Sequence, residues 1–282
     1  MFYYNKTMAD AKGLKEPQTI EEFEAFCKAL DGTDPVTGEH IWGFECLSDF
    51  LFYQGQFLWQ LGEFVWDEDG NSPAMNGTAM TRVLSDWRRW VDEGWCRPFD
   101  STNASAVAQE MFYQGKLASF FASCGSMGNI VKSTAEAGIE LGVACYPTYD
   151  LNNWIVPIGG GQINMVGLGN SEEVKKAAWE FVQFIYEDDN VADNAILSGY
   201  LPITKSVANN ERMQAWWAEY PCYKVPFDQL DRGICQETPF FPYNTEFSNN
   251  ANQICSTLIQ EGTITAEEAV AQLWANIAYM FN

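Results

Sequence analysis

The residues best suited to hold a ligand gather in two turns rich in glycine and serine. One turn, Ser123-Cys124-Gly125-Ser126, follows an apolar run and opens a helix. The other, Gly159-Gly160-Gly161, precedes a second apolar run. Glycine lets a ligand approach the main chain, and a helix start leaves backbone N–H groups free to donate hydrogen bonds. Both turns are therefore candidate ligand contacts, although a helix cap and a plain tight turn would explain them too.

Neither turn carries a nucleotide-binding or catalytic motif. The sequence has no GxxxxGK(S/T) phosphate loop, and Gly167-Leu168-Gly169 lacks the third glycine of a dinucleotide fingerprint. The serines lack the GxSxG context of a nucleophile, and the single histidine, His40, is too little for a triad or a multi-histidine metal site. The acidic turn 67–71 resembles part of a calcium loop, but Thr78 stands where a bidentate glutamate is required. We therefore expect no catalytic residue, no metal and no cofactor.

Aromatic side chains provide a second kind of candidate site. The chain contains 11 Trp and 12 Tyr, and such rings can stack on the flat faces of sugars or simply fill a core. The rings that we single out are Tyr53, Trp59, Trp66 and Trp154. A pair of carboxylates for glycoside hydrolysis also stays open, because 38 acidic residues offer many pairs. Among them we single out Glu45, on a predicted strand.

Length, charge and hydropathy limit the classes of protein that fit. The 282 residues, 47% of them hydrophobic, can bury one large or two moderate domains. A formal net charge of −22 repels phosphate backbones and anionic lipid, so we expect no nucleic-acid partner and no binding to a membrane surface. No apolar run approaches the roughly 18 residues of a membrane span. Of the eight cysteines, Cys222–Cys235 is the most plausible local disulfide, and reduced buried thiols are an equal alternative.

Predicted strands alternate with predicted helices, which indicates the α/β class. Short apolar runs predict strands at residues 2–5, 41–46, 117–122, 140–146 and 163–168. Helical spacing of apolar residues, with capping boxes at Thr19 and Thr265, predicts helices at residues 19–30, 48–61, 78–93, 103–114, 210–219, 245–261 and 265–281. Residues 157–206 form the central unit, in which the triple glycine, a strand and two helices lead to a second turn, Ser198-Gly199-Tyr200-Leu201-Pro202.

Six segments in order along nearly the whole chain carry a family resemblance. They are Tyr3-Tyr4-Asn5-Lys6 with residues 11–14 and 17–23, then 112–118, 123–130, 157–161, 178–185 and 199–203. Together they resemble the extracellular solute-binding proteins of ABC importers, in the sugar-type family that includes maltose- and glycerol-3-phosphate-binding proteins.

The resemblance implies a periplasmic-binding-protein-like fold of type II, in which two α/β lobes enclose a ligand cleft. Residues 1–148 would form the main lobe, 149–200 would cross into the remnant of the first lobe, and 201–282 would return to the main lobe. By position, the implied ligand contacts are Ser123, Gly160 and Tyr200. From the chemistry of the turns and rings described above we add Gly125, Ser126 and Gly161, with Trp59 and Trp154 as aromatic walls.

The implied function is non-enzymatic capture of a sugar or oligosaccharide for delivery to ABC permease subunits. It would take place on the extracellular face of the bacterial cell membrane or in the periplasm. In the glycerol-3-phosphate binders an arginine of the penultimate helix also helps to hold the ligand. Cys255 falls at that position here, which favours a neutral sugar over a glycerol phosphate.

The segment Tyr3-Tyr4-Asn5-Lys6 lies well inside the chain in that family, after a signal peptide, a lipid-anchoring cysteine and much of the first lobe. We therefore expect an N-terminally truncated sequence, which lacks most of the first lobe and the lipid anchor and which binds ligand weakly. Two alternatives stay open at this point: a glycan hydrolase with a carboxylate pair, and a fragment without independent function.

Overall fold

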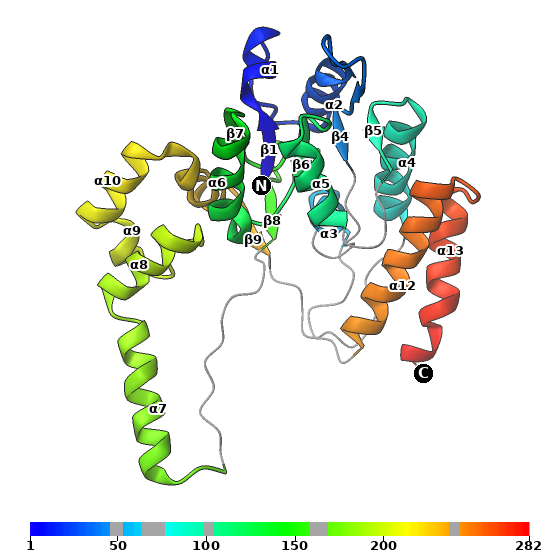
Figure 1. The fold of residues 1–282 in the computed structure, drawn as a ribbon. Helices are drawn as coiled ribbons and strands as arrows, with labels where there is room; N and C mark the ends of the chain where they lie inside the picture. Colours follow the sequence, from blue (N-terminus) through cyan, green and yellow to red (C-terminus); the bar gives the residue numbers. More distant parts are fainter. Residues whose placement is uncertain (46–52, 64–76, 99–103, 158–168, 237–242, 282) are drawn as a thin grey trace.

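A five-stranded mixed sheet forms the centre of the protein, in the order β5-β4-β6-β1-β7 (Figure 1). The structure is a computed structural model that describes residues 1–45, 53–63, 77–98, 104–157, 169–236 and 243–281. The strands of this sheet are β1 (Phe2–Asn5), β4 (Phe44–Glu45), β5 (Cys96–Arg97), β6 (Ser119–Phe121) and β7 (Leu141–Ala144). The α/β class predicted from the sequence is confirmed.

The register of the sheet places the ends of three strands at one edge. Strand β1 is antiparallel to both of its neighbours, with Tyr3 opposite Phe120 of β6 and Val143 of β7. Strands β6 and β7 therefore run in the same direction, and β4 is parallel to β6. The carboxyl ends of β4, β6 and β7 consequently meet at one edge of the sheet, which we call the carboxyl edge.

Alternate side chains of the strands pack against helices on the two faces of the sheet. On one face, Phe2 and Phe121 contact Phe23 of α2 (Ile20–Leu30), a helix whose capping box at Thr19 is present as predicted. Helices α3 (Gly55–Gln60) and α4 (Thr78–Asp92) cover the same face, with Phe57 and Trp87 in ring contact. The other face carries α5 (Ala104–Tyr113) and, beside it, α6 (Met127–Ala137).

The C-terminal helices pack outside α4 (Figure 1). They are α12 (Asn244–Ser256), a π-helical turn (Thr257–Glu261) and α13 (Ala266–Ile277), followed by a 3-10 turn (Ala278–Phe281). The predicted capping box at Thr265 opens α13. The single helix predicted for residues 265–281 is therefore divided near its end.

A second, smaller core lies among the helices after residue 171. It joins α8 (Asp188–Ser198), α9 (Lys205–Ala208) and α10 (Glu211–Glu219) through the apolar side chains of Val191, Ala192, Ala195, Val207, Ala208, Met213 and Trp217. Phe227 of α11 (Val225–Arg232) packs against this core. A 3-10 turn (Pro221–Lys224) connects α10 to α11. Helix α7 (Glu172–Ile185) precedes this group, has no buried residue and projects away from the sheet (Figure 1). Strand β8 (Ile155–Pro157), before this group of helices, pairs in parallel with β9 (Ile234–Gln236), after it.

The structure corrects the elements predicted around Gly43. The strand predicted for residues 41–46 is divided into β3 (His40–Ile41), which pairs with β2 (Gly32–Thr33), and β4. Backbone packing requires this glycine, because a Cβ atom at position 43 would lie 2.2 Å from the carbonyl oxygen of Cys27. The short helix α1 (Lys6–Ala11), capped by Asn5, was not predicted. The strand predicted at 163–168, the triple glycine and the acidic turn 67–71 lie outside the described residues.

Candidate functional site

The first predicted ligand turn lies directly after β6, at the carboxyl edge. Residues Cys124–Ser126 form one turn of 3-10 helix, and α6 begins at the next residue. Ser123 caps this turn, because its Oγ atom accepts a hydrogen bond of 3.1 Å from the N–H group of Gly125. The side chains of Ser123 and Ser126 are half-buried. The predicted cap at Ser123 is therefore confirmed, and the role of this turn as a ligand contact stays a prediction.

The second predicted turn packs on the first. Gly199 follows the last residue of α8, and its φ of 80° reverses the chain and favours glycine. The ring of Tyr200 then lies over Gly125, where an added Cβ atom would be 2.5 Å from Cζ of Tyr200. At Gly128 an added Cβ atom would be 3.4 Å from the carbonyl oxygen of Leu197. Two segments more than 70 residues apart in the sequence therefore form one surface, and Tyr200 remains 46% exposed on it.

The predicted aromatic walls, Trp59 and Trp154, are buried. Trp59 is 2% exposed on α3, and Trp154 is 9% exposed directly before β8, which packs against α3. In this conformation they are parts of the core rather than open stacking surfaces. The indole Nε1 atom of Trp154 is nevertheless buried without a hydrogen-bond partner among the described residues. A buried donor without a partner typically costs about 1–3 kcal/mol of stability.

Helix α3 also contributes two buried glutamines that the sequence reasoning missed. Gln60 donates through Nε2 to the carbonyl oxygens of Ile155 (3.2 Å) and Pro147 (3.4 Å), and its Oε1 atom accepts from the N–H group of Tyr149 (3.2 Å). The Oε1 atom of Gln56 is buried with no partner in the described part of the chain. Gln60 therefore fixes α3 to the loop after β7, and Gln56 holds an unused acceptor there. Buried polar residues on a short, otherwise apolar helix are the signal that would have indicated them.

Tyr3 is a further residue that the sequence reasoning did not single out. Its hydroxyl group donates to the carbonyl oxygen of Ser123 at 3.1 Å. Burial raises the pKa of Tyr3 well above its ordinary value, so the phenol stays a neutral donor. This hydrogen bond fixes the start of the turn at Ser123 to strand β1.

Glu45 is engaged in a structural ion pair. Its carboxylate is fully buried, and Oε2 accepts from Nη1 of Arg97 at 2.8 Å across β4 and β5. A carboxylate held by a neighbouring guanidinium is poorly suited to act as the acid or base of a hydrolase. The sequence suggestion of a role in glycoside hydrolysis is therefore not supported by the surroundings of Glu45.

Metal and disulfide chemistry receive no support from the described residues. Within those ranges, no three His, Cys, Asp or Glu side chains are grouped so that they could hold a metal ion. Cys222, one half of the most plausible local disulfide, carries a free thiol. No helix in the same ranges combines the length and hydropathy that crossing a bilayer requires. Gly160 and Gly161, the remaining predicted contacts, lie outside the described residues.

Most of the chain matches one protein family. Residues 1–222 match the family model described as "Bacterial extracellular solute-binding protein", and the chain belongs to this family. The resemblance stated from the sequence is thereby confirmed. Because the members are solute-binding proteins, the expectation that the chain is not an enzyme is confirmed at the level of the family.

The curated relatives are longer than this chain. A binding protein of Brucella abortus (strain 2308) is 25% identical over 233 residues, which cover 78% of this chain and 53% of that protein. The matched region of this chain therefore spans about half the length of that relative.

Solved structures of solute-binding proteins share the fold. UgpB from Mycobacterium tuberculosis was solved in complex with glycerophosphocholine. It superposes on this chain with a TM-score of 0.74 at 20% identity, and the match covers 99% of this chain and 68% of the UgpB chain. The cyclic alpha-maltosyl-1,6-maltose binding protein from Arthrobacter globiformis superposes with a TM-score of 0.76 at 20% identity. This match covers 99% of the present chain and 69% of the Arthrobacter protein. The periplasmic-binding-protein fold expected from the sequence is confirmed over about two thirds of those chains.

Proposed function

We propose that this chain is the carbohydrate-binding component of an ABC importer. The observation that carries the proposal is the meeting of two predicted ligand turns, at Gly125 and Tyr200, on the carboxyl edge of the sheet. Ligands of open α/β sheets bind outside the carboxyl ends of the strands, and the family of the chain supports solute capture. The protein would bind sugar on the extracellular face of the bacterial membrane or in the periplasm, close over it and dock on ABC permease subunits. A lipid anchor would be its attachment to the membrane.

The proposed ligand contacts are those of the two turns. The hydroxyl groups of Ser123 and Ser126 would bond to sugar hydroxyls, Gly125 would let a ring approach the main chain, and Tyr200 would contribute its exposed ring or hydroxyl group. Trp154 would donate from its unpartnered Nε1 atom. Trp59, Gly160 and Gly161 stay proposed contacts on the basis of the sequence alone.

A neutral saccharide fits this chain better than a glycerol phosphate. Cys255 stands where the resemblance assigns an arginine to the glycerol-3-phosphate binders. Its side chain is 1% exposed in the core, and burial raises its pKa to about 12, so the thiol is neutral and out of reach of a ligand. Arg97, near the same edge, is already paired with Glu45. A phosphate group would therefore find no matching charge at either position.

The proposed division into lobes explains the exposed face of α7. Residues 1–148 would form the main lobe, 149–200 would cross into the first lobe, and 201–282 would return. Val174, Phe181 and Phe184, which we call the α7 face, are each more than half exposed on that projecting helix. About a third of the Mycobacterium tuberculosis structure has no counterpart in the match. We propose that the α7 face packs against first-lobe structure of this kind, because exposed apolar patches mark missing contacts.

Isothermal titration calorimetry of the 282-residue chain against neutral saccharides and glycerol-3-phosphate tests this proposal. Chromatography of each sugar after incubation accompanies it. We expect weak, saturable binding of a neutral saccharide, no binding of glycerol-3-phosphate, and sugar recovered intact. Shorter sugars in the chromatogram would show a hydrolase and contradict the proposal. Binding of glycerol-3-phosphate alone would overturn the ligand class.

A further inference from the structure

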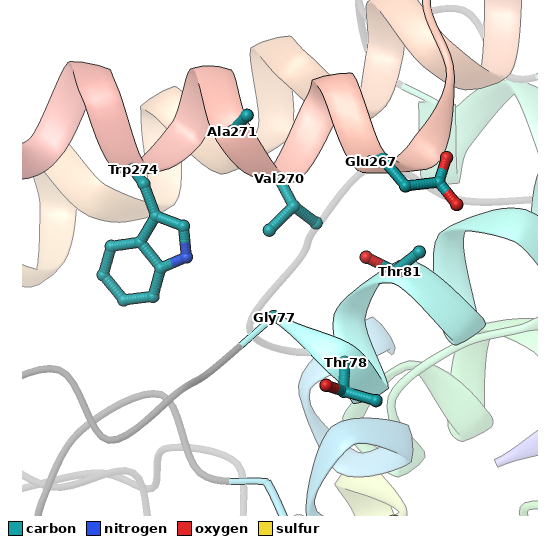
Figure 2. A pocket seen from close by; sticks show the side chains of 7 residues that line it. All are labelled: Gly77, Thr78, Thr81, Glu267, Val270, Ala271 and Trp274. Atoms are coloured by element: carbon teal, nitrogen blue, oxygen red, sulfur yellow. The ribbon is translucent and has the colours of Figure 1, made fainter.

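A surface pocket of about 470 Å³, widely open to solvent and called the cavity below, lies between the start of α4 and the side of α13, apart from the two turns. Its lining residues are Gly77, Thr78, Thr81, Glu267, Val270, Ala271 and Trp274. Figure 2 shows Trp274 and Val270 extending from α13 toward the α4 residues. Its volume lies within the range of small-molecule sites, about 300–1,000 Å³. The cavity is therefore large enough for a sugar ring.

Gly77 lets the start of α4 pack closely against α13 at the border of this cavity. Its φ is +89°, and a Cβ atom added there would lie 2.7 Å from Cγ1 of Val270 and 3.8 Å from Nε1 of Trp274. A side chain at position 77 would therefore collide with the α13 wall and fill the space beside the indole. The glycine leaves the N–H edge of Trp274 facing the cavity.

The cavity does not suit an anion, although it borders the N-terminus of a helix. The first N–H groups of α4 are already used, because Glu63 accepts from the N–H groups of Gly77 and Ala79, both at 2.7 Å. The carboxylate of Glu267 lies on the opposite side (Figure 2). No lysine or arginine is among the lining residues that the structure describes. Phosphate groups and carboxylates are consequently repelled.

The lining chemistry matches a neutral sugar ring. A pyranose ring has an apolar face of C–H groups and a rim of hydroxyl groups, which are both donors and acceptors. The indole of Trp274 and the side chain of Val270 provide an apolar surface for the face of such a ring. Thr81 and Glu267 provide a hydroxyl group and an acceptor for the rim.

We propose that this cavity is a second saccharide-binding site, with Trp274 as its stacking surface and Thr81 and Glu267 as its polar contacts. This proposal rests on the proposed function only for the class of ligand. The cavity itself shares no residue with the turns at Gly125 and Tyr200. A chain with both sites would hold two parts of a long oligosaccharide, or two separate sugars.

Nuclear magnetic resonance of the full chain, labelled with ¹⁵N in tryptophan, tests the second site directly. The indole N–H signal of Trp274 is assigned by its loss in Trp274→Phe, and the chain is then titrated with maltotetraose. We expect a saturable shift of this signal. Thr81→Val, which removes one hydroxyl group at nearly constant volume, should weaken the apparent affinity about three- to tenfold. Thr7→Val, on exposed α1 at the opposite edge of the sheet, is the matched control and should leave the titration unchanged.

The outcomes separate this proposal from the proposed function. A Trp274 signal that stays still up to saturating sugar, or that titrates identically in Thr81→Val, overturns the second site. A shift caused by inorganic phosphate at equal concentration overturns the class of ligand. The same titration in Tyr200→Ala should still move the Trp274 signal. If it does so while Tyr200→Ala changes no other sugar-dependent signal, the proposed site at the two turns fails and the second site stands.

Discussion

The ring of Tyr200 lies on the Cα atom of Gly125, so that the end of one helix covers the start of another. A Cβ atom at position 125 would be 2.5 Å from Cζ and 2.6 Å from the hydroxyl oxygen of Tyr200. No side chain other than hydrogen fits between them without movement. The contact brings the two predicted ligand turns to one place, and it makes the position of Tyr200 depend on a residue 75 positions earlier.

Replacement of Gly125 by alanine should move Tyr200 and weaken sugar binding at little cost in stability. The clashing atoms belong to the far end of a half-exposed side chain, which can rotate away, so we expect the free energy of unfolding to change by less than about 1 kcal/mol. The affinity for a neutral saccharide should fall about tenfold. Calorimetry and urea denaturation measure the two effects. Gly32→Ala, where an added Cβ atom meets nothing within 4 Å, is the control. Unchanged affinity in Gly125→Ala would argue against a ligand role for this pair.

Replacement of Gln60 by leucine should destabilise the fold by about 1–3 kcal/mol. Leucine keeps the volume of the side chain, but it leaves the buried carbonyl oxygen of Ile155 and the N–H group of Tyr149 without their partner. Urea denaturation measures the difference. Gln114→Leu is the matched control, because the side chain of Gln114, exposed directly after α5, donates to Glu110 on the surface of that helix. If Gln60→Leu is as stable as the control, Gln60 does not fix α3 to β8.

The sequence predicted local structure well where the signal was local. The capping boxes at Thr19 and Thr265 and the glycine after α8 each fixed a helix end, because their hydrogen bonds and backbone angles involve residues only a few positions apart. The burial of Trp59 and Trp154 was not predictable in this way. Their surroundings are set by the packing of α3 on β8, which joins segments about 95 residues apart.

In the candidate site, too, features set by neighbouring residues were predicted and features set by distant residues were not. Ser123 was identified as both cap and ligand contact from its own segment, and it is the cap. Gln60 and Tyr3 were missed because each acts through a partner far away in the sequence, such as the carbonyl oxygen of Ser123 for Tyr3. Gln56 was missed because its burial depends on the packing of α3 in the fold. The family resemblance predicted that the turns at Gly125 and Tyr200 contact the same ligand. The periodicity of apolar residues could not predict this, because it indicates only local helices and strands.

Acid should destabilise the protein partly through Glu93. Hydrogen bonds from Lys28 and Trp95, with Arg89 nearby, lower the pKa of Glu93 from 4.5 to about 2. A lowered folded-state pKa gives stability that is present above pH 4.5 and is lost as the pH falls toward 2. Because the carboxylate is about one third exposed, we expect a contribution of only about 1 kcal/mol. Thermal melts from pH 6 to 2 should show a smaller loss of stability in Glu93→Gln than in the unchanged chain. Glu136→Gln, on an exposed side of α6, is the control. Parallel curves for all three proteins would contradict this role of Glu93.

The α7 face should bind apolar probes in the isolated chain. Val174, Phe181 and Phe184 lie within one stripe of the helix, so a hydrophobic dye such as anilinonaphthalene sulfonate should fluoresce with the folded protein. The double variant Phe181→Ser, Phe184→Ser should lower this fluorescence at least about twofold, without a loss of helical circular dichroism. Val36→Ser, at a single exposed apolar residue in the loop before β3, should not. Equal dye binding in all three proteins would mean that the α7 face is not the exposed apolar surface.

The central claim is that a neutral saccharide binds at the turn formed by Ser123 and Gly125 together with Tyr200. The most direct measurement is the affinity of Tyr200→Ala for that saccharide, compared with Tyr186→Ala. The two tyrosines are 46% and 44% exposed, but Tyr186 follows α7, away from the turn. The account predicts that Tyr200→Ala weakens binding about tenfold or more and that Tyr186→Ala leaves it within about twofold. Equal affinities of the two variants would contradict the account and place the sugar elsewhere.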